Sequence, residues 1–108
     1  MARRTKASAA VPLSLPAELT IYTVGELHPQ WLAWLQQGAA NAPAELQATA
    51  VEQVDGAGLQ LLLSLARAAT ERGRALRIQS PSVVMRTGCA ALGLGSWLQG
   101  HVAEESPA

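Results

Sequence analysis

Residues 54–63 read Val-Asp-Gly-Ala-Gly-Leu-Gln-Leu-Leu-Leu, and this short stretch carries the strongest structural signal in the chain. Asp55 can cap a helix, because its carboxylate accepts hydrogen bonds from first-turn N–H groups that have no partner within the helix. Gly56 and Gly58 allow a sharp turn and leave no side chains over the start of that helix. The stretch therefore predicts a strand that ends at Asp55 and a helix that follows it.

The helix after this turn is the most clearly defined element of the sequence. Its apolar residues recur at helical spacing and form one face: Leu59, Leu62, Leu63, Ala66 and Ala69. Gly73 supplies a stop signal. We expect this helix to run from Ala57 to about Arg72.

A second helix is expected earlier in the chain. Thr23 and Glu26 have the spacing of a capping box, which predicts a helix of about 15 residues that ends near Gly38. Pro29 falls in the second turn, so a start nearer Glu26 is also open. Trp31 and Trp34 lie on its apolar stripe, which favours the core for both tryptophans. If one of them were exposed, it would instead be a candidate contact residue.

Short strands are expected between these helices. Residues 11–15 are predicted as a strand, and residues 17–22 as a second short strand or a strand that leads into a loop. Residues 45–51 are predicted as a central strand that ends at the Asp55 turn, and residues 75–79 as a further strand. Because proline cannot donate to a ladder, Pro12 and Pro16 confine the first strand to a sheet edge or end.

The C-terminal part of the sequence predicts one more helix. Ser80 is expected to cap it, with Pro81 at its first position. The glycines at 93 and 95 end it, after which Trp97 and Leu98 fold back onto the core. Helices that alternate with strands indicate the α/β class, with a parallel or mixed sheet.

Composition is that of a single folded domain. The chain has 108 residues, of which 49% are hydrophobic and 15% charged, and this is enough apolar material for a core. We expect a flexible tail at 1–9, one domain at 10–100 and a polar tail at 101–108. A formal net charge of zero gives no electrostatic case for nucleic acid.

Several further function classes find no support in the sequence. Cys89 is the sole cysteine, which excludes an internal disulfide and a cysteine-based zinc site and fits a reducing compartment. His28 and His101 have no neighbours at metal-ligand spacing. No stretch approaches the roughly 18 apolar residues of a membrane span. We therefore expect a cytoplasmic protein with no cofactor, no metal and no membrane insertion.

Charge is distributed unevenly along the chain. All charged residues between positions 18 and 55 are acidic, whereas those between 67 and 86 are arginines opposed only by Glu71. Two interpretations stay open: an ordinary solvated surface, or a bipolar surface that orients a protein partner.

Three pieces of the sequence together resemble the STAS domain family, over roughly residues 10–100. They are the Asp55 turn, the segment Ala17-Glu18-Leu19 followed by Tyr22-Thr23, and Leu76-Arg77-Ile78-Gln79-Ser80-Pro81-Ser82 with Leu92-Gly93-Leu94. The resemblance implies a single layer of four to five mixed strands with helices packed mainly on one face.

This chain departs from the STAS pattern at the position that usually matters most. Family members commonly read Asp-Ser-x-Gly-Leu or Asp-Thr-x-Gly-Leu at the turn, and that hydroxyl is the usual phosphate acceptor. Gly56 stands there instead and has no oxygen to phosphorylate. Thr20 and Gln47 also stand where carboxylates are common. We therefore expect no phosphorylation switch at this turn.

The resemblance implies a non-enzymatic protein-binding module of the anti-sigma factor antagonist type. Its bacterial partner would be a kinase-like regulator, such as an anti-sigma factor or a histidine kinase of the chemotaxis type, in signal transduction or transcription regulation. The alternative is an accessory STAS subunit on the ATPase of a bacterial phospholipid-transport ABC system. The implied contact residues are Glu18, Thr20, Thr23, Asp55, Gly56, Ala57, Gly58, Gln60 and Ser64.

An enzyme is the remaining alternative. Aspartyl chemistry at Asp55 would need further carboxylates to hold Mg²⁺, and Glu52 is the one acidic residue close to it in the sequence. Capping a helix explains Asp55 without chemistry. We expect no catalytic residues.

Overall fold

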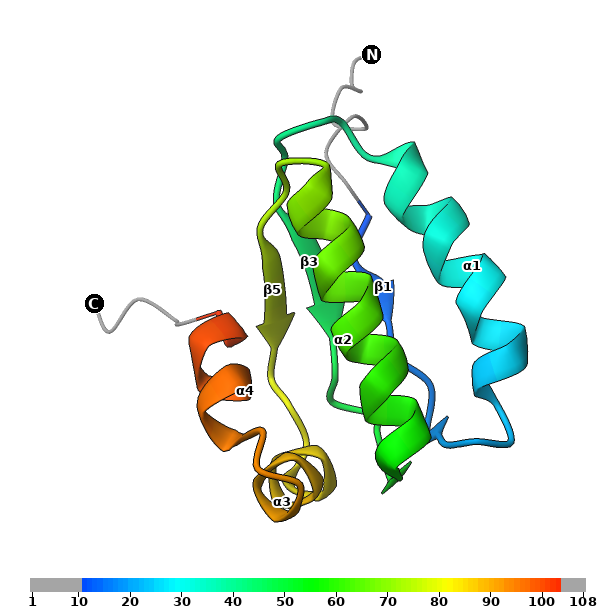
Figure 1. The fold of residues 1–108 in the computed structure, drawn as a ribbon, viewed down its shortest axis with the longest axis vertical. Helices are drawn as coiled ribbons and strands as arrows, with labels where there is room; N and C mark the ends of the chain where they lie inside the picture. The colour runs from blue at the N-terminus through cyan, green and yellow to red at the C-terminus, as the bar shows by residue number, and fades with distance from the viewer. Residues whose placement is uncertain (1–10, 104–108) are drawn as a thin grey trace.

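The computed structural model describes residues 11–103. Within these residues, four helices and five short strands follow one another in the order β1-β2-α1-β3-β4-α2-β5-α3-α4 (Figure 1). The strands are β1 (Leu13–Ser14), β2 (Glu18–Leu19), β3 (Ala44–Gln47), β4 (Gln53–Val54) and β5 (Leu76–Gln79). The helices are α1 (Val24–Gln37), α2 (Gly56–Glu71), α3 (Val83–Ala91) and α4 (Gly95–His101). The expected tail at 1–9 and residues 104–108 of the expected tail at 101–108 lie outside the described residues, whereas His101 ends α4 and Val102 pairs with Ile78.

All strand pairings are parallel. Three strands form one sheet in the order β1-β3-β5, and β2 pairs with β4 in a second, two-stranded sheet. Helices α1 and α2 lie side by side over one face of the larger sheet, with α3 and α4 beyond its β5 end (Figure 1). The predicted α/β class and STAS-like architecture are confirmed, with the strands divided between two small sheets.

The two faces of the larger sheet differ in chemistry. Ala44 and Leu46 of β3 and Leu76 and Ile78 of β5 are buried beneath the helices, because successive side chains of a strand point to opposite faces. The alternate positions are polar. There the Gln47 amide donates to Gln79 Oε1 (3.0 Å), and the Gln79 amide donates to Glu45 Oε1 (2.9 Å).

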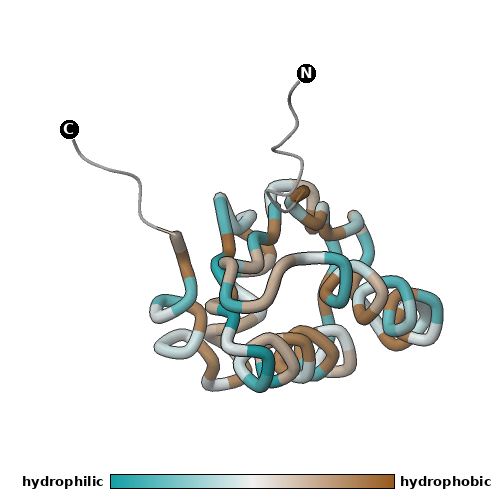
Figure 2. Tube along the Cα trace, turned by 90° about the horizontal axis from the view of Figure 1, so that it is seen from above, coloured by the Kyte–Doolittle hydropathy of each residue, from teal (hydrophilic) through white to brown (hydrophobic). Residues whose placement is uncertain are grey.

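The core is built mainly from aliphatic side chains. Trp31 and Leu35 of α1 pack with the apolar stripe of α2, in which Leu59, Leu62 and Leu65 are buried. Seen from above, the helices carry both hydrophobic and hydrophilic stretches, as expected of helices that bury one face (Figure 2). The core role predicted for Trp31 is confirmed. Trp34 is half-buried, and its indole N–H donates to the Val11 carbonyl (2.7 Å).

The helix α2 agrees closely with its prediction. Asp55 is its N-cap, and the Asp55 carboxylate accepts a hydrogen bond from the Gly58 N–H. Gly73 follows the C-terminal end with a φ of 72°, a left-handed conformation that glycine adopts without a steric penalty.

The expected central strand at 45–51 was wrong in extent. It divides into β3 and β4, which belong to different sheets. The strand divides because its two ends hydrogen-bond to different segments. The Ala48 N–H donates to the Gln79 carbonyl, whereas the N–H groups of Glu52 and Gln53 both donate to the carbonyl of Ala17. The intervening turn carries the chain from one sheet to the other.

One predicted helix cap was wrong, and a second lacks its predicted side-chain bonds. Ser82, not Ser80, caps α3, because its hydroxyl accepts from the Met85 N–H (3.1 Å) while Ser80 has a φ of 51°. Thr23 is the N-cap of α1 but makes no side-chain cap bond, so the capping box with Glu26 does not form.

Two further elements differ in detail from expectation. Helix α1 begins at Val24 and contains Pro29, so its start does not shift toward Glu26. The segment around Trp97 and Leu98 does fold back, with Leu98 buried, and it forms the helix α4, which the sequence did not predict.

Candidate functional site

Asp55 joins the start of α2 to the loop after β2. Its Oδ1 accepts from the Gly58 N–H (3.0 Å), and its Oδ2 accepts from the Ile21 N–H (3.0 Å). The Asp55 N–H donates to the Leu19 carbonyl (3.2 Å). The N–H groups of Ile21 and then Gly58 hold the pKa of Asp55 below its ordinary value, against a smaller opposing effect of burial. A single carboxylate thus fixes two segments that lie 34 residues apart in the sequence.

The loop at 18–23 is held by its own polar side chains. The Thr20 hydroxyl donates to Glu18 Oε2 (2.7 Å) and accepts from the Tyr22 N–H (3.2 Å). The Thr23 hydroxyl accepts from the Thr20 N–H (3.1 Å) and lies 3.1 Å from the Glu18 carbonyl, to which it can donate. Glu18, Thr20 and Thr23 therefore shape the loop, and Thr20 is only 8% exposed.

The two glycines of the turn have different surroundings. A Cβ at Gly56 would have Leu92 Cδ1 at 3.9 Å as its nearest neighbour, so there is room for a side chain. A Cβ at Gly58 would lie 1.9 Å from the carbonyl oxygen of Leu19. Gly58 is buried against β2, whereas Gly56 is exposed. Of these two predicted contact residues, only Gly56 is accessible to a partner.

Exposed apolar side chains surround Gly56. Tyr22 is 89% exposed, Ile21 is 58% exposed and Leu92 is 54% exposed. Sequence reasoning placed the segment from Glu18 to Thr23 at the contact surface but singled out neither Ile21 nor Tyr22, and it placed Leu92 in the third helix. The available signal was position, because Ile21 and Tyr22 directly precede Thr23, the N-cap of α1.

A shallow groove of about 450 Å³ continues from Ile21 between α1 and α2. Val24, Gly25 and His28 line it on the α1 side, and Ala57, Gln60, Leu61 and Ser64 line it on the α2 side. Gln60 and Ser64 are exposed, and Ala57 is half-buried. The structure thus brings the predicted residues Ala57, Gln60 and Ser64 together along one edge of α2.

We refer to the accessible part of this region as the turn surface: Ile21, Tyr22, Gly56, Ala57, Gln60, Ser64 and Leu92. Most of its residues are apolar, and its polar residues are not arranged as an acid–base pair or as a nucleophile with its base. The described residues hold no group of three or more His, Cys, Asp and Glu side chains that would bind a metal ion. Its geometry suits contact with another macromolecule better than chemistry.

Two residues with reactive side chains lie away from this surface. Cys89 is buried in α3, and burial raises the pKa of its thiol. His101 lies in α4, where its Nδ1 is 2.9 Å from the carbonyl of Trp97. Across residues 11–103, none of the helices combines the length and the apolar character that crossing a bilayer requires.

Comparison with known proteins identifies the family. The family model described as "Mlab, STAS domain" matches residues 2–100, nearly the whole chain. No curated protein and no solved structure matches this chain. STAS domains generally mediate protein–protein interactions and are generally not enzymes. Because the match includes the Asp55 turn and all strands, the chain belongs to the STAS domain family.

Proposed function

We propose that this protein is a non-enzymatic, cytoplasmic docking module of the anti-sigma factor antagonist type, and that it binds its partner through the turn surface. The observation that carries the proposal is the exposure of Ile21 and Tyr22 beside an exposed Gly56, on a loop that Asp55 holds in place. Exposed aromatic and apolar side chains on a fixed backbone are typical of protein-binding hot spots. Because its backbone is already fixed, such a surface loses little conformational entropy when a partner binds.

Docking at this surface is not subject to a phosphorylation switch at position 56. Glycine has no side-chain hydroxyl to phosphorylate, and nearby hydroxyls are poor substitutes. Thr20 and Thr23 are engaged in the loop, and Ser64 lies two turns along α2. The complex is therefore controlled by partner concentration or competition.

The proposed partner is a kinase-like regulator, either an anti-sigma factor or a histidine kinase of the chemotaxis type. The acidic residues Glu18, Glu26 and Glu52 come from segments near the turn surface, and they favour a partner with basic groups at its contact.

A second candidate partner is the ATPase of a bacterial phospholipid-transport ABC system. The glycine at position 56 supports this alternative, because a fixed subunit of a STAS family has no need of a phosphate acceptor. In that complex Gly56 would be a packing residue.

Capture with the tagged wild-type chain, followed by mass spectrometry, distinguishes the two partners. We expect a kinase-like regulator. Recovery of a transporter ATPase would assign the second function. A separate incubation with ATP, followed by intact-mass analysis, should show no phosphate adduct and no turnover, and either one would contradict the non-enzymatic assignment.

A further inference from the structure

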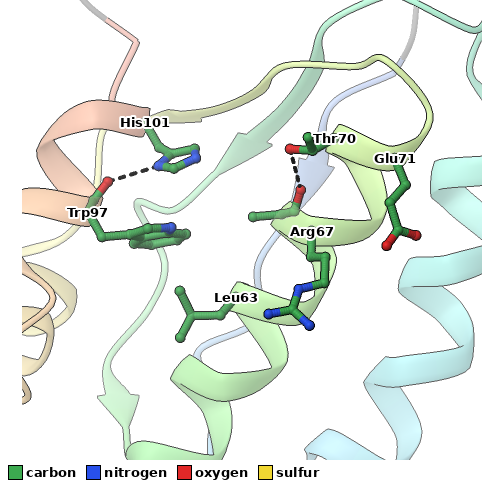
Figure 3. A pocket seen from close by; sticks show the side chains of 7 residues that line it. Leu63, Arg67, Thr70, Glu71, Trp97 and His101 are labelled. Atoms are coloured by element: carbon green, nitrogen blue, oxygen red, sulfur yellow. Dashed lines mark hydrogen bonds between the residues drawn. The ribbon is translucent and has the colours of Figure 1, made fainter.

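A second hollow, of about 490 Å³, lies between α2 and α4 (Figure 3). Leu63 and Ala66 line its α2 side together with Arg67 and Glu71, and Trp97 and His101 line its α4 side. The rings of Trp97 and His101 project from α4 toward α2 in Figure 3. We call this hollow the α2/α4 groove.

Trp97 forms a braced aromatic platform in this groove. Its ring centroid lies 4.5 Å from that of His101 at an interplanar angle of 34°. His101 Nδ1 lies 2.9 Å from the Trp97 carbonyl, and since a carbonyl only accepts, the ring proton is placed on Nδ1. Within residues 11–103 the indole N–H of Trp97 has no hydrogen-bond partner. A rigid aromatic side chain with a free donor is well suited to contact a protein.

The α2/α4 groove and the turn surface are linked by a further hollow between them. A third hollow on the exposed side of α2 is lined by Gln60, Leu63, Ser64 and Arg67. It shares Gln60 and Ser64 with the groove beside α1, and it shares Leu63 and Arg67 with the α2/α4 groove. Three neighbouring hollows with shared lining residues therefore follow α2 from Ile21 to Trp97, and we treat them together as one depression.

The dimensions of this depression match one protein interface. Gly56 and Arg67 lie eleven positions apart on α2, about 16 Å along the helix axis at 1.5 Å per residue. A stable interface buries about 800 Å² on each partner, a patch roughly 30 Å across. The residues around Gly56 alone cover only part of such a patch, whereas the whole depression fits within it.

The charges along this surface differ between the two ends of α2. The carboxylates of Glu18, Glu52 and Asp55 come from segments at the Gly56 end. At the other end Arg67 and Arg72 are exposed, and Glu71 is the one acidic residue of the last two turns. A partner that spans the surface is therefore complementary if it places acidic groups over the α2/α4 groove.

We propose that the partner's contact extends along α2 into the α2/α4 groove, where an acidic segment places an apolar side chain on Trp97 and a carboxylate at Arg67. This inference rests on the proposed function and identifies the chemistry of the partner's segment. It also assigns Trp97 and Arg67 as contact residues, beyond the residues of the Asp55 turn.

Site-specific photo-crosslinking tests the extent of the surface. Cys89 is buried, so cysteines introduced by Gln60→Cys, Thr70→Cys and Ser14→Cys can be labelled selectively with a benzophenone and exposed to lysate of the source cells. Gln60 belongs to the turn surface, Thr70 lines the α2/α4 groove, and Ser14 is an exposed control on β1. We expect positions 60 and 70 to crosslink to the same polypeptide and position 14 to give no specific adduct. The peptide attached at position 70 should contain Asp or Glu beside a large apolar residue.

The possible outcomes distinguish a failure of this inference from a failure of the proposed function. An adduct at position 60 but not at 70, or adducts with two different proteins, overturns the inference and leaves the turn surface as the docking site. Absence of adducts at both positions overturns both proposals. A partner peptide at position 70 without acidic residues refutes the assigned chemistry.

Affinity measurements with the crosslinked protein, once purified, complete the test. Arg67→Glu should weaken binding by about tenfold or more, whereas the control Arg77→Glu, at an exposed arginine on the polar face of the larger sheet, should change it by less than about twofold. Equal effects of the two variants would show that only overall charge matters and would overturn the role of Arg67. Circular dichroism verifies that both variants are folded.

Discussion

Gly56 and Gly58 are separated by one residue, yet the structure assigns them different roles. Gly58 allows β2 and α2 to approach so closely that no side chain fits between them. Gly56 faces outward beside Leu92 and leaves room where the family usually has a hydroxyl. The absence of a phosphate acceptor is therefore not forced by packing at this turn.

Substitution by alanine should separate these roles. Gly58→Ala should lower the free energy of unfolding by about 2–3 kcal/mol, because its Cβ would overlap the Leu19 carbonyl oxygen and the backbone would have to move. Gly56→Ala, the matched control, should be neutral or slightly stabilising, since alanine favours a helix. Urea denaturation measures both. Equal destabilisation by the two changes would contradict the close contact at Gly58.

Asp55 should make the stability of the protein depend on pH. Its folded-state pKa lies below the ordinary value of 3.8, so its ionised form contributes stability that is present above about pH 4. That contribution is lost as the pH falls through the folded-state pKa. Asp55→Asn keeps a capping side chain without the charge. The difference in urea midpoint between wild type and variant should therefore shrink from pH 7 to about pH 3. A difference that is constant with pH would argue against the role of the ionised carboxylate.

At the scale of elements, Arg74 connects segments that the sheets do not join. It is 1% exposed, and its guanidinium donates to the carbonyls of Leu35, Ala42 and Pro43. Burial, followed by the charge of Arg72, lowers the pKa of Arg74. Arg74 thereby ties the C-terminal end of α1 to the loop before β3.

Replacement of this arginine should loosen the packing of α1. Arg74→Lys keeps the charge but cannot reproduce the fork of donors, and it should reduce the free energy of unfolding by about 2 kcal/mol. Arg77→Lys, on an exposed position of β5, should change it by less than about 0.5 kcal/mol. Denaturant titration of the two variants gives the comparison, and similar values for both would refute the role of Arg74.

The elements also show how far the sequence predicts the structure. Helix α2 was predicted almost completely, because its cap, apolar stripe and glycine stop are all local signals. The division between β3 and β4 depends on hydrogen bonds to Ala17, more than thirty residues away, and has no local signal. Helix α4 lacks a capping side chain, since its N-cap is Leu94, and it follows a glycine-rich stretch.

The candidate site was predicted only in part, because some of its contacts are local in the sequence and others depend on tertiary structure. The Asp55 cap follows from the residues around it, whereas the second hydrogen bond, to the Ile21 N–H, depends on tertiary structure. Burial of Gly58 and exposure of Tyr22 likewise depend on where β2 lies relative to α2.

At the scale of the whole molecule, the fold gathers several of its accessible apolar groups, among them Ile21, Tyr22 and Leu92, along one side. The loop at 18–23, the N-terminal end of α2 and the end of α3 converge around Gly56, and the hollows along α2 extend this surface to α4. The opposite face of the larger sheet carries a network of glutamine and glutamate side chains. The side that carries the turn surface is thus suited to docking, and the polar face of the sheet is suited to contact with solvent.

The most direct test of the proposed docking surface is calorimetric titration of the purified partner with the wild type, Gly56→Asp and Gly100→Asp. Both substitutions exchange an exposed glycine for the same charged side chain, and neither position has a neighbour closer than 3.9 Å to the new Cβ. We predict that Gly56→Asp weakens binding by about tenfold or more, because a charge enters the apolar turn surface. Gly100→Asp should leave the affinity within about twofold. Unchanged affinity of a folded Gly56→Asp protein would contradict docking at the turn surface.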